Sequence, residues 1–143
     1  MGPEHDYKVS EFMNKDLIEV TPGTTVKNCA NVMAAERVSS VIVTENNALV
    51  GIVTEKDLAR KIVAKGLESD KILVKDIMST GVLTIEPQTS LYDATLKLTS
   101  KKIKHLPVVS DNIVVGLITA MDILRVQPAL MELMNSPTSK SQA

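Results

Sequence analysis

The sequence places a threonine three residues before an aspartate at equivalent points of its two halves. Thr54 precedes Asp57 and Thr119 precedes Asp122, each pair directly after an apolar stretch. This spacing resembles a helix capping box, in which the acid lies near the positive end of a helix. A carboxylate is also a good acceptor for the two hydroxyls of a ribose, and a poor neighbour for a phosphate. The pairs therefore predict two helix starts, and each carboxylate is a candidate ligand-binding group.

A second candidate group occurs in one half only. Lys104 and His105 enter an apolar stretch of the second half, where the first half has Ser39 and Ser40. A lysine ammonium and an imidazole N–H can both donate hydrogen bonds to a phosphate. The alternative is that the two residues only continue the solvated basic face of the preceding helix. If they do bind phosphate, the two halves differ in this ability.

No group of residues suited to catalysis or metal binding stands out. The single cysteine, Cys29, lies beside Ala30 on an apolar stripe and is interpreted as a small core residue. With two histidines and one cysteine the chain offers no metal-ligand set. We find no Ser/His/Asp set and no paired acids. We therefore expect no catalytic residue, no metal and no resident cofactor.

Composition narrows the class of protein. The chain of 143 residues is 44% hydrophobic and 23% charged, with a net charge of −1. This near-neutral balance argues against a dedicated nucleic-acid binder, so a nucleic-acid partner is not expected. No apolar run approaches the ~20 residues that cross a bilayer, so no membrane association is expected either. One cysteine cannot form an internal disulfide, which favours a reducing, cytoplasmic setting.

The chain contains an internal repeat. A shift of 65 residues, which brings Val9 onto Val74, aligns the two halves without a gap. Eleven pairs are identical: Val9/Val74, Met13/Met78, Pro22/Pro87, Thr24/Thr89, Val43/Val108, Asn47/Asn112, Val50/Val115, Gly51/Gly116, Thr54/Thr119, Asp57/Asp122 and Arg60/Arg125. A repeat of this kind predicts two copies of one structural unit.

Each copy has the pattern β-α-β-β-α, which predicts an α/β (α+β) fold. The predicted elements are strands at 17–20 and 82–85, amphipathic helices over 26–33 and 91–98, hairpins of 41–44 with 49–53 and of 106–109 with 114–118, and last helices starting at Thr54 and Thr119. The predicted domains are 8–65 and 73–127. Residues 1–7 are interpreted as a disordered or tag-derived start, and 128–143 as a short helix with a polar tail.

The repeated segments resemble a known family. GIVTEKDL (51–58) and GLITAMDI (116–123) both fit the CBS-domain signature of Gly, two apolar residues, Thr or Ser, two variable residues, Asp and an apolar residue. HLPVV (105–109) and the segments that lead each copy (9–13 and 74–78) are also similar to the family. The resemblance covers roughly residues 8 to 126. It implies a CBS pair arranged about a pseudo-twofold axis, with two clefts between the repeats that bind AMP, ADP, ATP or, in some members, S-adenosylmethionine.

The resemblance also implies roles for individual residues. Asp122 and Asp57 would hold a ribose, with Thr119 and Thr54 reaching the ribose or phosphate. Lys104 and His105 would contact phosphate beside Asp122, so the Asp122 cleft should be the stronger site. The adenine would lie against aliphatic side chains and backbone, because the chain has one Phe, two Tyr and no Trp for stacking. The residues expected around the base and its borders are Ile18, Val20, Thr21, Ser39, Ser40, Ile85 and Pro87.

The expected function is that of a regulatory adenine-nucleotide-binding module, which senses energy or metabolite state through an unidentified partner protein and catalyses nothing. Two alternatives stay open: a purely structural dimerisation module with non-functional clefts, and a CBS pair that binds S-adenosylmethionine. A homodimer is expected from family habit. Its interface is predicted on the helices after Thr54 and Thr119, where Leu58, Ile62, Ile123 and Leu124 are apolar.

Overall fold

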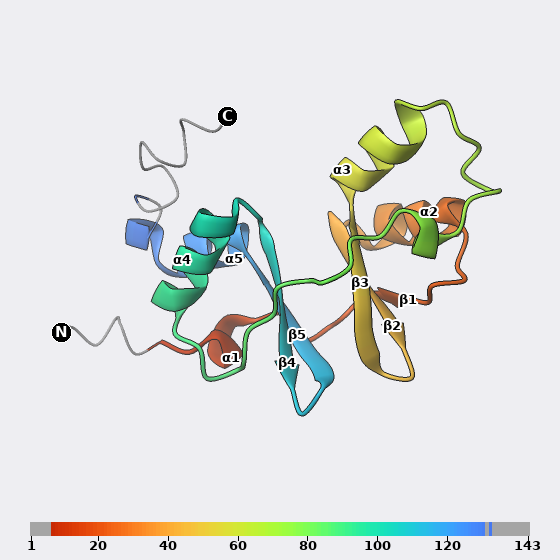
Figure 1. Ribbon diagram of the computed structural model, residues 1–143. Coiled ribbons are helices and arrows are strands. Elements are labelled where there is room, and N and C mark those ends of the chain that lie inside the picture. The colour runs from red at the N-terminus through yellow and green to blue at the C-terminus, as the bar shows by residue number, and fades with distance from the viewer. Residues whose placement is uncertain (1–6, 131, 133–143) are drawn as a thin grey trace. The chain divides into compact units, whose positions relative to one another are not determined.

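A computed structural model describes residues 7–130 and 132 of the chain. These residues fall into two units (Figure 1). Residues 17–82 form the first, which we call the Asp57 unit. Residues 7–16 together with 83–130 and 132 form the second, the Asp122 unit. The parts of the expected start and tail at 1–6, 131 and 133–143, with His5 among them, lie outside the described residues.

The Asp57 unit is a three-stranded sheet with helical segments. Its elements are β1 (Glu19–Val20), α2 (Val26–Glu36), β2 (Ser40–Glu45), β3 (Ala48–Thr54), α3 (Glu55–Asp57), a π-helical turn (Leu58–Val63) and a 3-10 turn (Val74–Asp76). The strand order is β1-β2-β3, with β1 parallel to β2 and β2 antiparallel to β3. The predicted first strand, helix and hairpin of this repeat are therefore present.

The Asp122 unit follows the same plan with one strand reduced. Its elements are α1 (Val9–Phe12), α4 (Leu91–Lys101), β4 (His105–Ser110), β5 (Ile113–Thr119), α5 (Ala120–Val126) and a 3-10 turn (Pro128–Leu130). The strand predicted over 82–85 is only a single parallel bridge between Ile85 and Val108. Pro107 lies within β4 rather than at its start. Its carbonyl accepts a hydrogen bond from Ile85 N–H (3.1 Å). Among the described residues, this edge of β4 pairs only through the bridge between Val108 and Ile85, so it tolerates a residue that has no N–H to donate.

The helix and turn boundaries follow from local sequence in both units. The Thr25 side chain accepts a hydrogen bond from Asn28 N–H and caps α2, and the Ser90 side chain caps α4 in the same way. Both helices end on a left-handed residue, Arg37 or Lys102, at φ 56°. The two predicted hairpin turns are confirmed, and each has two consecutive residues at positive φ, as a type I′ turn requires.

The leading segment of each repeat packs in the unit built by the other repeat. Val9 N–H donates to the Thr89 carbonyl (2.8 Å), and Asn14 pairs with Leu117 of β5. In the same way, Val74 N–H donates to the Thr24 carbonyl (2.8 Å), and Ser79 pairs with Ile52 of β3. The sequence repeats and the folded units are thus offset by this exchange.

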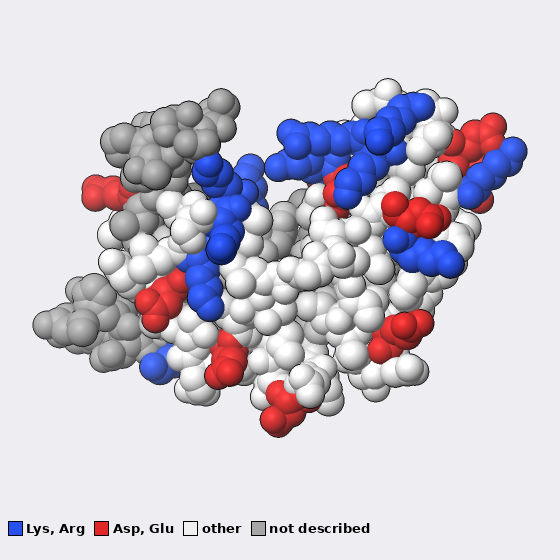
Figure 2. All heavy atoms as spheres, viewed as in Figure 1, with Lys and Arg blue, Asp and Glu red and all other residues white. Residues whose placement is uncertain are grey.

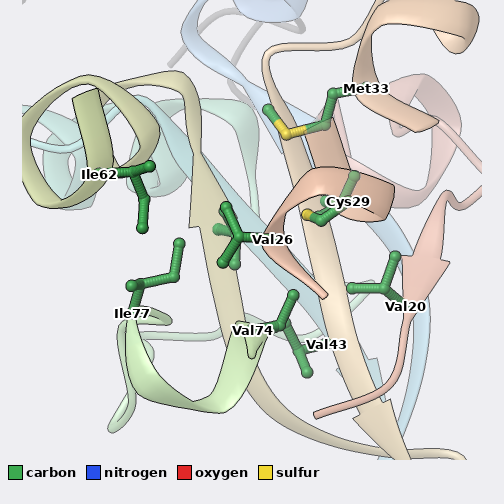
Figure 3. Packing of buried hydrophobic residues seen from close by; sticks show 10 residues of the cluster. Val20, Val26, Cys29, Met33, Val43, Ile62, Val74 and Ile77 are labelled. Carbon is green, nitrogen blue, oxygen red and sulfur yellow. The ribbon is translucent and has the colours of Figure 1, made fainter. Parts of the chain in front are cut away.

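Each unit has its own aliphatic core. In the Asp57 unit, side chains of α2 face β1 and β2, and the exchanged segment after residue 72 adds to the cluster (Figure 3). The labelled members are Val20, Val26, Cys29, Met33, Val43, Ile62, Val74 and Ile77. Burial of one such side chain contributes about 1.5–3 kcal/mol, so the exchanged segments are integral to the stability of each unit.

Candidate functional site

Both Thr-x-x-Asp pairs form capping boxes at the junction of a strand and a helix. Thr119 N–H donates to Asp122 Oδ2 (3.0 Å), and Asp122 N–H donates back to Thr119 Oγ1 (3.2 Å). The equivalent distances for Thr54 and Asp57 are 2.9 Å and 3.4 Å. The two predicted helix starts are confirmed. In each box the threonine N–H engages the Oδ2 atom of the aspartate, so Oδ1 takes no part in the capping and is the atom to consider as a ligand acceptor.

The register of the β4–β5 hairpin places the candidate phosphate donors beside the second capping box. His105 is directly opposite Thr119, and Ala120 N–H donates to the Lys104 carbonyl (3.0 Å). Lys104 is exposed and His105 is half-buried. The four residues Lys104, His105, Thr119 and Asp122 therefore meet at one end of the hairpin, and we call them the Thr119 group.

The equivalent positions of the Asp57 unit meet in the same way but offer weaker chemistry. Ser40 is opposite Thr54, and Glu55 N–H donates to the Ser39 carbonyl (3.0 Å). Ser39 is exposed, whereas Ser40 is buried with 5% of its surface accessible. Neither side chain carries a charge, so this end of the β2–β3 hairpin lacks the cationic donor that Lys104 supplies.

The two aspartates differ in their surroundings. Asp57 Oδ1 forms an ion pair with Lys61 Nζ at 3.0 Å, and only 10% of the Asp57 side chain is exposed. Asp57 Oδ2 also accepts from Thr54 Oγ1 (3.3 Å). Asp122 Oδ1 faces Arg125 at 3.7 Å, beyond hydrogen-bonding distance, and 23% of the Asp122 side chain is exposed. Asp122 is the more accessible acceptor.

Lys61 was not identified from the sequence. Its Nζ donates to the Ile77 carbonyl (2.8 Å) as well as pairing with Asp57, so it joins the first helix turn to the exchanged segment. The repeat offset assigns Val126 as its counterpart in the other half. The two repeats therefore differ four residues after the repeated aspartate, where one has a lysine and the other an apolar residue. This difference is the sequence signal that could have identified Lys61.

The residues expected around the base lie in both units. Ile18, Val20 and Thr21 belong to the Asp57 unit, and Ile85 and Pro87 to the Asp122 unit. The side chains of Val20 (7% exposed) and Ile85 (3%) are core residues of their own units. Thr21 is exposed and its hydroxyl shares a hydrogen bond with Thr24 Oγ1 (3.1 Å). Ile18, Thr21 and Pro87, together with the exposed Ser39, are thus the members with surface available to a ligand.

Two of the four residues expected at a dimer interface are not available for one. Ile62 and Ile123 are buried in the cores of their own units, because they face inward from the segments after Thr54 and Thr119. Leu58 and Leu124 are half-buried. The same segments expose Val63 (76%) and Met121 (56%) instead. An apolar contact surface on these segments would therefore combine the two remaining predicted residues, Leu58 and Leu124, with Val63 and Met121.

Cationic side chains gather over the segment that follows β3 and along α4 (Figure 2). Those of α4 and the residues after it are exposed: Lys97, Lys101, Lys102 and Lys104. Lys104 is distinguished from the others by its position next to the Thr119 capping box. The remaining lysines fit the solvated basic face that was the alternative interpretation of this stretch.

The other candidate chemistries find no support among the residues that the structure describes. Burial raises the pKa of the Cys29 thiol to about 11, so it is not a thiolate nucleophile at neutral pH. Within 7–130 and 132, no three His, Cys, Asp or Glu residues are grouped as metal ligands. In the same range, no helix has the length and apolar character needed to cross a bilayer.

Comparison with known proteins gives consistent matches. The family model described as "CBS domain" matches residues 9–64 and 74–129. An uncharacterized protein of Methanopyrus kandleri is 35% identical over 94% of this chain and 69% of its own length. A CBS domain-containing protein of Arabidopsis thaliana is 35% identical over 71% of this chain, but the match spans only 19% of that protein. The crystal structure of an uncharacterized conserved protein from Pyrococcus horikoshii superposes with a TM-score of 0.79 and 28% identity, covering 85% of this chain and 92% of that one.

Proposed function

Because the chain belongs to the CBS-domain family and carries two copies of the domain, which is generally regulatory rather than catalytic, we propose that it is a regulatory module for an adenine nucleotide. The ligand would be AMP, ADP or ATP, and the ligand state would be passed to a partner protein. The proposal includes a homodimer, and a cytoplasmic setting that rests on the single, unpaired cysteine.

The observation that carries the proposal is the Thr119 group. A nucleotide presents two neighbouring ribose hydroxyls and, a few atoms away, a phosphate. Asp122 offers a carboxylate oxygen outside hydrogen-bonding distance of Arg125, and the exposed Lys104 directly precedes strand β4, where its carbonyl accepts from Ala120 N–H. The Asp122 carboxylate can accept hydrogen bonds from the hydroxyls, and the Lys104 ammonium can donate to the phosphate. The Thr119 group therefore matches both polar parts of one ligand.

The same chemistry ranks the alternatives. S-adenosylmethionine has a ribose but a cationic sulfonium where a nucleotide has its first phosphate, so it would bring a positive charge rather than an anion towards Lys104 at that point. A purely structural module would need Asp122 for the capping box only, and would have no use for the exposed cationic residue Lys104 beside it. The phosphate-bearing nucleotides are therefore favoured over both.

Isothermal titration with AMP, ADP, ATP, adenosine, GMP and S-adenosylmethionine tests the proposal. An adenine nucleotide should bind more tightly than GMP and S-adenosylmethionine. At 100 times its dissociation constant it should raise the free energy of unfolding by about 2.7 kcal/mol. If none of the three adenine nucleotides binds measurably, the proposal is wrong.

Asp122→Asn supplies the matched variant. It keeps the size of the side chain and an oxygen for the capping bond but removes the charge, and it should weaken binding by about tenfold or more. Ser90→Ala is the control, because it removes a side-chain cap in the same unit at the start of α4, whereas Lys104 follows the end of that 11-residue helix. It should cost about 1 kcal/mol of stability and leave nucleotide affinity unchanged.

A further inference from the structure

Lys61 forms an ion pair with the Asp57 carboxylate, which is the group of the first repeat that could otherwise bind a second ligand. Its ammonium lies 3.0 Å from Asp57 Oδ1 and 2.8 Å from the carbonyl oxygen of Ile77. Ile77 is 5% exposed and is fixed in turn by its N–H, which donates to the Val74 carbonyl (3.0 Å). The ammonium is therefore held between two buried acceptors that belong to different segments of the Asp57 unit.

The acceptor capacity of Asp57 is largely used inside the protein. Three donors point at its two oxygens: Thr54 N–H, the Thr54 hydroxyl and Lys61 Nζ. A carboxylate has about four lone-pair positions, so little remains for a pair of ribose hydroxyls. Asp122 accepts from Thr119 N–H and faces Arg125 only at 3.7 Å. Val126, the counterpart of Lys61, has no donor to offer.

We propose that Lys61 is an internal counter-cation that closes the Asp57 position to ligands, so that each chain binds one nucleotide, at Asp122. This inference rests on the proposed function, and it assigns the difference between the two sites to a residue of the chain. Lys61 acts here through Asp57 and is a specificity-determining residue rather than a ligand contact.

Displacement of the ammonium by a ligand is unfavourable for two reasons. It would leave the Ile77 carbonyl without this donor while that carbonyl stays buried, and an unsatisfied buried acceptor is costly. It would also separate an ion pair whose carboxylate is largely shielded from solvent, where removing one partner costs more than at an exposed pair. The exposed pair of Arg125 and Asp122 carries no such penalty, since 72% of the Arg125 side chain is exposed.

Titration of AMP into single variants, with stoichiometry measured per chain, tests the inference. The wild-type protein should bind one AMP, and this event should be weakened about tenfold or more in Asp122→Asn and unchanged in Asp57→Asn. Lys61→Met keeps an unbranched apolar stem and removes the ammonium, so it should gain a second event. That second event should be about tenfold weaker than the first, because the Asp57 unit has Ser39 where the other has Lys104, and it should be absent from Lys61→Met/Asp57→Asn.

Lys71→Met is the matched control for loss of one positive charge in the same unit. Lys71 forms an ion pair with Glu68 (2.7 Å) in which both side chains are more than half exposed. Its replacement should leave one event of unchanged affinity. A second event in this control would contradict the assignment to Lys61.

The reverse substitution, Val126→Lys, places a lysine four residues after Asp122 and should weaken the wild-type event about tenfold or more. It decides the matter if Lys61→Met fails to fold. If AMP, ADP and ATP all fail to bind the wild-type protein, the proposed function itself is refuted; if AMP alone fails, the same titrations are made with the adenine nucleotide that binds. Four other results would each overturn the role of Lys61 while the function stands. They are two equal wild-type events, a single event that depends on Asp57, a folded Lys61→Met with one event, and an unaffected Val126→Lys.

Discussion

Met78 lies directly over Gly51 of β3. A Cβ atom added to Gly51 would be 2.6 Å from the Met78 sulfur and 3.0 Å from the backbone oxygen of Ser79. Met13 lies over Gly116 of β5 in the same manner. Both glycines and both methionines are identical pairs of the sequence repeat, but each methionine covers the glycine of the other repeat. The absence of a side chain on the strand is what lets the exchanged segment dock.

We predict that Gly51→Ala and Gly116→Ala each lower the free energy of unfolding by about 1–3 kcal/mol, because the added methyl group overpacks a closed contact. Denaturant titration measures the change. Gly23→Ala is the control, since nothing lies within 4 Å of its added Cβ, and it should shift stability by about 0.5 kcal/mol or less.

A double-mutant cycle separates the contact from other effects of the glycine replacement. Met13→Ala should relieve most of the loss caused by Gly116→Ala, giving a coupling energy of about 1 kcal/mol or more. Relief should be smaller for Met78→Ala with Gly51→Ala, because the Ser79 backbone oxygen remains close. Strict additivity in the Met13/Gly116 cycle would contradict the docking role.

Sequence reasoning recovered the elements whose signals are local. The two hairpins, the two capping boxes and the amphipathic helices α2 and α4 all depend on residues close together in the chain, and all are confirmed. The strand at 82–85 was wrong in extent, because pairing at Ile85 is limited to one bridge with Val108. The number of bridges that a short edge segment forms is a tertiary property.

The exchange of leading segments and the role of Lys61 could not be read from the repeat. Two equal copies of a segment such as 9–13 and 74–78 give the same pattern whether each packs on its own repeat or on the other. Lys61 stands in a charged stretch that reads as a solvated face, and only the fold brings the Ile77 carbonyl within 2.8 Å of its ammonium. The position of His105 opposite Thr119, by contrast, follows from the hairpin register.

Replacement of Lys104 by methionine should weaken AMP binding about tenfold, because a charged donor to phosphate contributes ~1.5–3 kcal/mol. The loss should shrink as salt screens the interaction. Adenosine lacks the phosphate, so its affinity should be equal for Lys104→Met and the wild-type protein. Calorimetry with both ligands measures the contrast, and an equal loss for adenosine would show that Lys104 acts on structure instead.

For the proposed homodimer, light scattering should give twice the chain mass of 15.5 kDa at micromolar concentration. Val63 and Met121 are the exposed apolar residues of the segments after Thr54 and Thr119. Val63→Glu and Met121→Glu should therefore favour the monomer, because association would bury the introduced charge. Ile113→Glu, at an exposed position on β5, is the control and should leave the mass unchanged. A monomeric wild-type protein would remove the homodimer from the proposal.

The Cys29 thiol makes stability depend on pH in the alkaline range. Burial raises its pKa from 9.0 to about 11, so the folded protein holds this proton more strongly than the unfolded chain. The resulting stabilisation is fully present below pH 9 and is lost as the pH rises towards 11.

Cys29→Ala is the matched variant, because Ala94 occupies the equivalent buried position of the other repeat. Urea titrations from pH 8 to 11 should show a steeper loss of stability for the wild-type protein than for Cys29→Ala, with a difference of about 2–3 kcal/mol across the range. Parallel curves for the two proteins would show that the thiol ionises as readily in the folded state as in the unfolded chain.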